Sequence, residues 1–157
     1  MHFLGACLFF LLAGAPGCSS LSTKAESIKN TVNRLHIIAQ ITLLHVKKLR
    51  TELPPAPQIK LSTPSIQGLT SISHDLGLLT DELQSIFTEP SQIQTDVSSL
   101  EGLVGHLART MDCPIQAKPQ GPTGDALFPH TQVYVTLTKV QLYLDSFLLH
   151  KDKLMVC

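Results

Sequence analysis

The sequence predicts an all-α protein, a four-helix bundle in which the first two helices run one way and the last two run the other. Four segments place apolar residues at alternating steps of three and four, which is the spacing of one face of an α-helix. The connections between these segments are long, short and long, and two cysteines follow the third and fourth segments. Together these features indicate one domain with an up-up-down-down topology and one disulfide.

The first predicted helix spans residues 24–53. Its apolar stripe runs from Ile28 to Leu53 and is unbroken by glycine or proline. Thr23 with Glu26 three residues later has the pattern of a capping box at the start, and Pro54 with Pro55 ends the helix. The basic residues near the end suit the negative end of the helix dipole.

The second predicted helix spans residues 69–86. Either Ser71 or Ser73 is expected to be its N-cap. Gly77 lowers helix stability by about 1 kcal/mol relative to alanine, so the first turns are expected to be loose. The charged residues of this helix, Asp75, Asp81 and Glu82, are interpreted as an exposed face and not as an acid–base pair.

The third predicted helix spans residues 91–113 and has the clearest pattern. Its apolar residues are Ile93, Val97, Leu100, Val104, Leu107 and Met111. Ser91 and Gln94 form a second capping-box pattern. At the other end, Pro114 pushes Cys113 out of the helical region and stops the helix.

The last predicted helix spans residues 131–153, and its first turns give a mixed signal. Val133, Val135 and Leu137 alternate as in a strand, and the residues between them also favour strands. The helical spacing nevertheless continues from Val133 to Phe147, far beyond the usual length of a strand, so we expect a helix throughout.

The connections determine the topology. The first helix is about 40 Å long, and the ~17 residues that follow it can extend over roughly 55 Å, enough to return along the bundle. The short link at residues 87–90 forces the second and third helices to be antiparallel. In this arrangement Cys113 and Cys157 end parallel helices at the same pole, whereas an up-down-up-down bundle would place them too far apart to bond.

The first twenty residues are expected to be a secretory signal peptide. Residues 3–15 are almost wholly apolar but too short to span a bilayer. Cleavage after Ser20 leaves residues 21–157 as one domain with two cysteines, which in an exported chain favours one disulfide over two unrelated buried thiols. Cleavage after Gly17 leaves three cysteines, and a bacterial lipoprotein signal ending at Cys18 is a weaker alternative because Ala15-Pro16-Gly17 is a poor lipobox.

Composition and motifs argue against several functional classes. The formal net charge is +0 and no basic stripe exists, so nucleic-acid binding is not expected. No further apolar run is long enough to span a membrane. The histidines do not share a metal-ligand spacing, and no catalytic or phosphate-binding motif occurs. We therefore expect no enzyme activity, no cofactor and no metal.

Three segments carry a family resemblance. IKNTVNRL, from Ile28 to Leu35, resembles IKTIVTRI in the first helix of mammalian leptins. VTLTKVQ, from Val135 to Gln141, resembles their VALSRLQ, and QIQTDVSSLEGL resembles fish leptins. Cys113 and the final Cys157 match the leptin disulfide. The chain departs from the family in having no tryptophan and no aromatic residue in the connection after the first helix.

The resemblance implies a secreted hormone with long-chain cytokine topology that clusters a class I cytokine receptor, resembling the leptin receptor, and that is a monomer when free. One receptor surface is expected on the first and third helices, and a second contact at the start of the last helix. The residues at matching positions are Lys29, Asn30, Arg34, Asp96, Ser99, Gly102 and Leu103 for the first surface, and His130, Thr131 and Gln132 for the second.

Small residues on the third helix bear on the first surface. Thr95, Ser98, Ser99, Gly102 and Gly105 mostly point away from the apolar stripe. They reflect either sequence drift on a surface that tolerates small residues or a flat face that a receptor domain approaches closely. Two other functional hypotheses remain: a long-chain helical cytokine acting on a different class I receptor, and a carrier of an apolar ligand inside the bundle.

Overall fold

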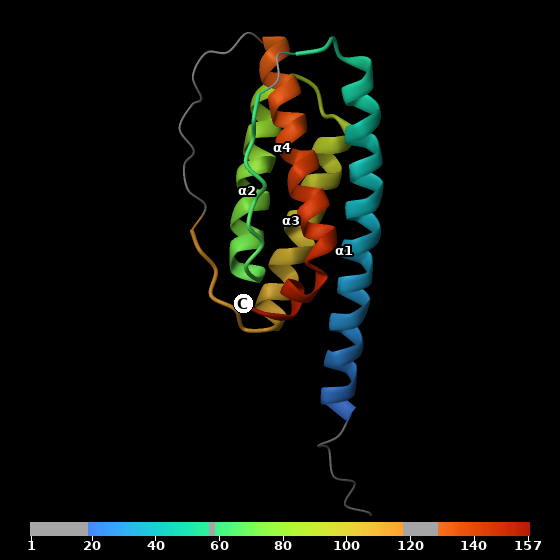
Figure 1. Ribbon diagram of the computed structural model, residues 1–157. Helices are drawn as coiled ribbons and strands as arrows, with labels where there is room; N and C mark the ends of the chain where they lie inside the picture. Colours follow the sequence, from blue (N-terminus) through green and yellow to red (C-terminus); the bar gives the residue numbers. More distant parts are fainter. Residues whose placement is uncertain (1–18, 57–58, 118–128) are drawn as a thin grey trace, which may run out of the picture.

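The computed structural model describes residues 19–56, 59–117 and 129–157, and these parts of the chain contain helices and no strand (Figure 1). The elements are α1 (Ser19–Glu52), α2 (Leu69–Ile86), α3 (Gln92–Thr110), α4 (Pro129–Leu149) and the short 3-10 helix η1 (Lys151–Met155). The all-α class and all four expected helices are confirmed. Most of the expected signal peptide, with Cys7 and Cys18, lies outside the described residues.

The helices run up-up-down-down. In Figure 1, α1 and α2 rise together, while α3 and α4 descend. The main helix–helix contacts are those of α1 with α3 and α4, and of α2 with α3 and α4. Every main contact therefore joins antiparallel helices, and the parallel pairs lie diagonally across the bundle. This is the topology that the long, short and long connections predict.

The ends of α1 and α2 differ from the sequence-based expectations. α1 begins at Ser19, so Thr23 and Glu26 lie inside the helix and do not cap its start. The N-cap of α2 is Gly68, not Ser71 or Ser73. Ser71 instead accepts a hydrogen bond from the Gly68 amide at 3.3 Å and donates one to the Gly68 carbonyl at 3.1 Å. Gly77 is buried within the helix.

The start of α3 is as predicted, whereas its end comes earlier. The Gln94 amide donates to Ser91 Oγ at 3.1 Å, and the Ser91 amide donates to Gln94 Oε1 at 3.4 Å, which completes the capping box. The helix ends at Thr110, three residues before Cys113. Asp112 has a left-handed φ of 58°, and the Cys113 amide bonds to the Ala108 carbonyl at 2.9 Å, as in a Schellman motif.

The mixed segment at the start of α4 is helical. Val135 and Leu137 are both buried, and Thr138 Oγ1 donates to the Tyr134 carbonyl one turn back at 2.8 Å. Tertiary packing of the continuing apolar stripe therefore outweighs the strand propensity of this segment. The α-helix ends at Leu149 and not near Lys153, because the chain tightens into η1.

One contiguous apolar core fills the space between the four helices. Its largest fully buried side chains are Leu35, Val46, Leu69, Ile72, Leu76, Leu83, Val97, Leu100, Leu107, Leu137, Leu144 and Leu154. The buried polar residues Thr42 and Thr80 donate their hydroxyls to the carbonyl one turn back, at 2.7 and 2.9 Å. These hydroxyls are thus buried without a loss of hydrogen bonding.

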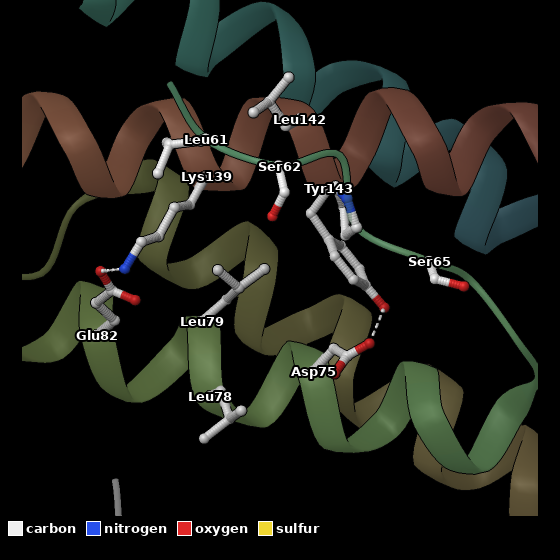
Figure 2. Close-up of a pocket in the computed structure, with 11 residues that line it drawn as sticks. Leu61, Ser62, Ser65, Asp75, Leu78, Leu79, Glu82, Lys139, Leu142 and Tyr143 are labelled. Atoms are coloured by element: carbon white, nitrogen blue, oxygen red, sulfur yellow. Dashed lines mark hydrogen bonds and ion pairs between the residues drawn. The ribbon is translucent and has the colours of Figure 1, made fainter. Parts of the chain in front are cut away.

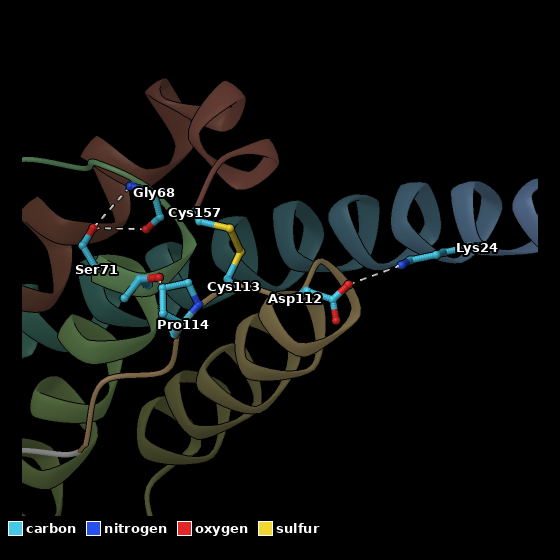
Figure 3. Close-up of a disulfide and its surroundings, with 8 residues drawn as sticks. Lys24, Gly68, Ser71, Asp112, Cys113, Pro114 and Cys157 are labelled. Carbon is cyan, nitrogen blue, oxygen red and sulfur yellow. Dashed lines mark hydrogen bonds and ion pairs between the residues drawn. A yellow bond between two sulfur atoms is a disulfide. The ribbon is translucent and has the colours of Figure 1, made fainter.

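The predicted disulfide joins Cys113 to Cys157 with a Cα–Cα distance of 5.3 Å (Figure 3). Beside it, the Leu69 amide donates to the Val156 carbonyl at 2.8 Å, and the Thr70 amide donates to the Cys157 carbonyl at 3.2 Å. The last residues of the chain therefore satisfy two of the free amides at the start of α2. The disulfide, the end of α3, η1 and the start of α2 meet at this pole of the bundle.

Candidate functional site

Three of the residues expected on the first surface meet in a groove between α1 and α3. The groove has a volume of about 460 Å³, and Asn30 and Arg34 from α1 line it together with Leu103 from α3. Both Asn30 and Arg34 are exposed, and Leu103 is half-buried against the core. This end of the surface thus combines a guanidinium, an amide and an aliphatic side chain that are all accessible from solvent.

Asp96, also expected on this surface, is held by its own chain. His45 Nδ1 on α1 lies 2.8 Å from Asp96 Oδ2, and Gln92 Nε2 donates to Asp96 Oδ1 at 2.6 Å. The Asp96 side chain is only 13% exposed. A partner that contacts Asp96 therefore meets a carboxylate already oriented by His45, so Asp96 helps to set the arrangement of α1 and α3.

Ser99 and Gly102 lie on the outer side of α3 and are both exposed. The Ser99 hydroxyl donates to the Thr95 carbonyl at 2.9 Å. A Cβ added at Gly102 would meet no atom within 4 Å, and one at Gly105 would only touch the end of Arg109 at 3.7 Å. Packing inside the chain therefore does not require either glycine.

Lys29 does not join Asn30 and Arg34. It lines a different groove, between α1 and η1, with Ile28, Val32 and Met155. Successive residues of a helix are about 100° apart, so Lys29 points away from the α1–α3 groove that its neighbour Asn30 lines. The expected first surface therefore divides into a set at the α1–α3 groove and Lys29 outside it.

The second expected contact lies at the start of α4, apart from the α1–α3 groove. His130 is exposed, and Thr131 and Gln132 are half-buried in the first turn of α4. Figure 1 shows the start of α4 at the top of the molecule, while the first turns of α1 lie at the bottom. Two spatially separate groups of accessible residues are therefore present.

Arg50 fixes the start of α4 to the end of α1. Its guanidinium donates to the Tyr134 hydroxyl at 3.0 Å and also to Gln141 Oε1. Tyr134 lies two residues after Gln132, so this contact determines where the exposed first turn of α4 sits. The sequence analysis had related the basic residues in the last turns of α1 only to the dipole of that helix.

The chain is similar to a known hormone. Leptin-B of Oryzias latipes is 46% identical to it over 143 residues, and the match covers 90% of each chain. The chain belongs to the leptin family. No family model and no solved structure matches it. The leptin resemblance of the three sequence segments is thus confirmed, and it extends over nearly the whole chain.

A third hollow, a pocket of about 400 Å³, lies beneath the connection that follows α1 (Figure 2). Lys139 Nζ and the Thr136 hydroxyl both bond to Glu82 Oε1, at 2.8 and 2.9 Å. The Tyr143 hydroxyl donates to Asp75 at 3.4 Å. Burial, and then the Asp75 carboxylate, raise the pKa of the Tyr143 phenol. These hydrogen bonds therefore connect α2 to α4.

The expectation that the acidic residues of α2 form an exposed face was wrong. Asp75 and Glu82 are half-buried and face α4, whereas an exposed face had been expected.

Among the described residues no three metal-ligating side chains gather around one point. Within the same residues no helix is both long and apolar enough to cross a membrane.

The structure adds two contacts that the sequence did not indicate, the His45–Asp96 pair and the Arg50 clamp. Their partners are 51, 84 and 91 residues apart along the chain. The only sequence signal was the placement of His45 and Arg50 near the end of a long amphipathic helix, which does not identify a partner.

Proposed function

We propose that this chain is a secreted leptin-like hormone, released after cleavage of residues 1–20, that binds and clusters a class I cytokine receptor in the control of energy balance and appetite. It acts by binding alone, without catalysis, and is a monomer before it meets the receptor. The observation that carries the proposal is the 46% identity to Leptin-B over 90% of the chain. The accessible groups on the α1–α3 face and at the start of α4 support it, since clustering needs more than one receptor contact.

In this proposal the two groups have different roles. Asn30, Arg34, Ser99, Gly102 and Leu103 form the surface that supplies most of the affinity, at and beside the α1–α3 groove. The open space around Gly102 allows a receptor domain to approach the backbone of α3 closely. The start of α4, with His130, Thr131 and Gln132, makes the second contact that brings receptor chains together.

The direct test is binding of oxidised residues 21–157 to immobilised receptor ectodomains. We expect binding to the ectodomain of a fish leptin receptor and none to the ectodomains of other class I cytokine receptors. Preferred binding to one of those receptors would instead assign the chain to a different cytokine system. Binding to none would remove the proposal.

Two variants test the α1–α3 surface. Arg34→Glu reverses an exposed charge in the groove, and Gly102→Arg fills the open space on α3. Each is expected to weaken receptor binding at least tenfold, because loss of a central hot-spot contact typically costs about 2 kcal/mol or more. Circular dichroism should show unchanged helicity, since neither residue packs in the core. Wild-type affinity in both variants would contradict the assignment of this surface.

A further inference from the structure

The outer face of α1 carries an exposed aliphatic stripe, defined as Ile37, Ile41 and Leu44. These side chains are 54%, 45% and 67% exposed. Their spacing of four and three residues places them on one face of the helix. That face is opposite the fully buried residues Leu35, Ala39 and Val46. Large aliphatic side chains that lie next to one another in water form an apolar patch, and the largest such patch on a monomer is often functional.

The aliphatic stripe lies between the two ends of the α1–α3 surface. Ile37 follows Arg34, which lines the groove, by three residues, and Ile41 precedes His45, which pairs with Asp96, by four. Three and four residues are the spacings at which helix side chains are neighbours on one face. The stripe therefore continues the surface of the proposed receptor contact along α1.

The charges at the ends of the aliphatic stripe indicate what covers it. Arg34 and Lys48 are both exposed, and each is seven residues from Ile41. If a second copy packed its α1 antiparallel about Ile41, Arg34 of one copy would face Lys48 of the other. Like charges brought together at an interface disfavour that pairing. A partner with an apolar patch between acidic side chains meets no such repulsion.

We infer that the aliphatic stripe is the apolar centre of the receptor-binding surface, with Arg34 and Lys48 as its basic ends, and that it fits an apolar receptor patch flanked by carboxylates. This inference rests on the proposed function. It gives the surface the arrangement typical of protein interfaces, in which a few central apolar residues supply most of the affinity and polar groups surround them.

The test compares the receptor affinity of oxidised variants of the chain. Ile37→Ser combined with Ile41→Ser removes the centre of the stripe, and Lys48→Glu reverses one basic end. Ile115→Ser is the matched control, because Ile115 is 58% exposed and lies outside the four helices, just after the disulfide. We expect the double variant to raise the Kd at least tenfold and Lys48→Glu at least fivefold. The control should stay within twofold of the wild type, and Lys48→Glu should also weaken the dependence of Kd on salt.

The outcomes separate this inference from the proposed function. If the wild-type chain binds and Arg34→Glu weakens binding, but the double variant and Lys48→Glu keep wild-type affinity, the inference is overturned and the proposed function stands. If sedimentation shows a wild-type dimer that the double variant abolishes without a change in receptor affinity, the stripe binds a second copy, and the inference is again overturned. Failure of the wild-type chain to bind overturns both.

Discussion

Replacing Gly68 with alanine should destabilise the bundle, although the change is confined to one methyl group. A Cβ at this position would lie 2.5 Å from the Cys157 carbonyl carbon and 2.7 Å from its oxygen. These are backbone atoms of a segment fixed by the disulfide, so they cannot move aside as a flexible side chain can. The φ of Gly68 is −178°, which any residue adopts, so the effect arises from contact and not from backbone strain.

The size of the destabilisation follows from which backbone atoms must move. Relieving the contact shifts the last residues away from α2 and breaks the hydrogen bonds of the Leu69 and Thr70 amides, now 2.8 and 3.2 Å long. Each is worth about 1 kcal/mol net, and overpacking of this kind typically costs about 1–3 kcal/mol. Adding the two hydrogen bonds to the overpacking, the free energy of unfolding should therefore fall by about 3–5 kcal/mol.

Urea denaturation with the disulfide intact measures this change, and Gly102→Ala is the matched control. Gly102 has open space around it and lies within α3, so alanine should raise the free energy of unfolding by about 0.5–1 kcal/mol. The two glycine-to-alanine changes should thus have opposite signs. Equal or greater stability of Gly68→Ala, with Gly102→Ala behaving as expected, would refute the close approach of the chain end to α2.

Three further predictions concern the disulfide, the end of α3 and the start of α4. Replacing both Cys113 and Cys157 with serine should lower the free energy of unfolding by up to about 4 kcal/mol, the chain-entropy value for a loop of ~45 residues; a loss below about 1 kcal/mol by urea titration would contradict it. Asp112→Gly should stabilise the chain by about 0.5 kcal/mol, because glycine adopts the observed φ of 58° without steric conflict, and a lower melting temperature would argue against this conformation. Thr131→Ala combined with Gln132→Ala should preserve receptor binding but reduce signalling in reporter cells, whereas full signalling would exclude the start of α4 as a contact.

The sequence contained enough information for the topology because that depends on a few strong constraints. Connection lengths limit which helices can be parallel, and the cysteines after the last two helices require that those ends meet. Helix ends were harder to predict. At α2, serine is a favoured N-cap residue, which is why Ser71 was expected to start the helix. The carbonyl groups of the chain end instead accept hydrogen bonds from the amides after Gly68, so the helix starts earlier.

The candidate site was only partly predictable from sequence. Asn30, Arg34 and Leu103 do lie in one groove, because similarity to a family transfers positions along a helix, while their role in receptor binding stays a prediction. Lys29, beside Asn30 in sequence, faces another groove, since the rotation of α1 against its neighbours decides which side a residue occupies. The His45–Asp96 contact depends on the axial register of α1 against α3, which no local pattern encodes.

The meeting of three chain segments around Cys113 and Cys157 makes the two poles of the molecule unequal under reducing conditions. Once the sulfur–sulfur bond is cleaved, the chain end is no longer tied to the end of α3 and is held to the first turn of α2 by the backbone hydrogen bonds of the Leu69 and Thr70 amides. The opposite pole keeps its short α2–α3 turn, with the Ser91–Gln94 cap intact. Amide hydrogen exchange in the reduced protein should therefore be fastest at the cysteine pole and advance along α2 and α3, so that unfolding has a defined direction.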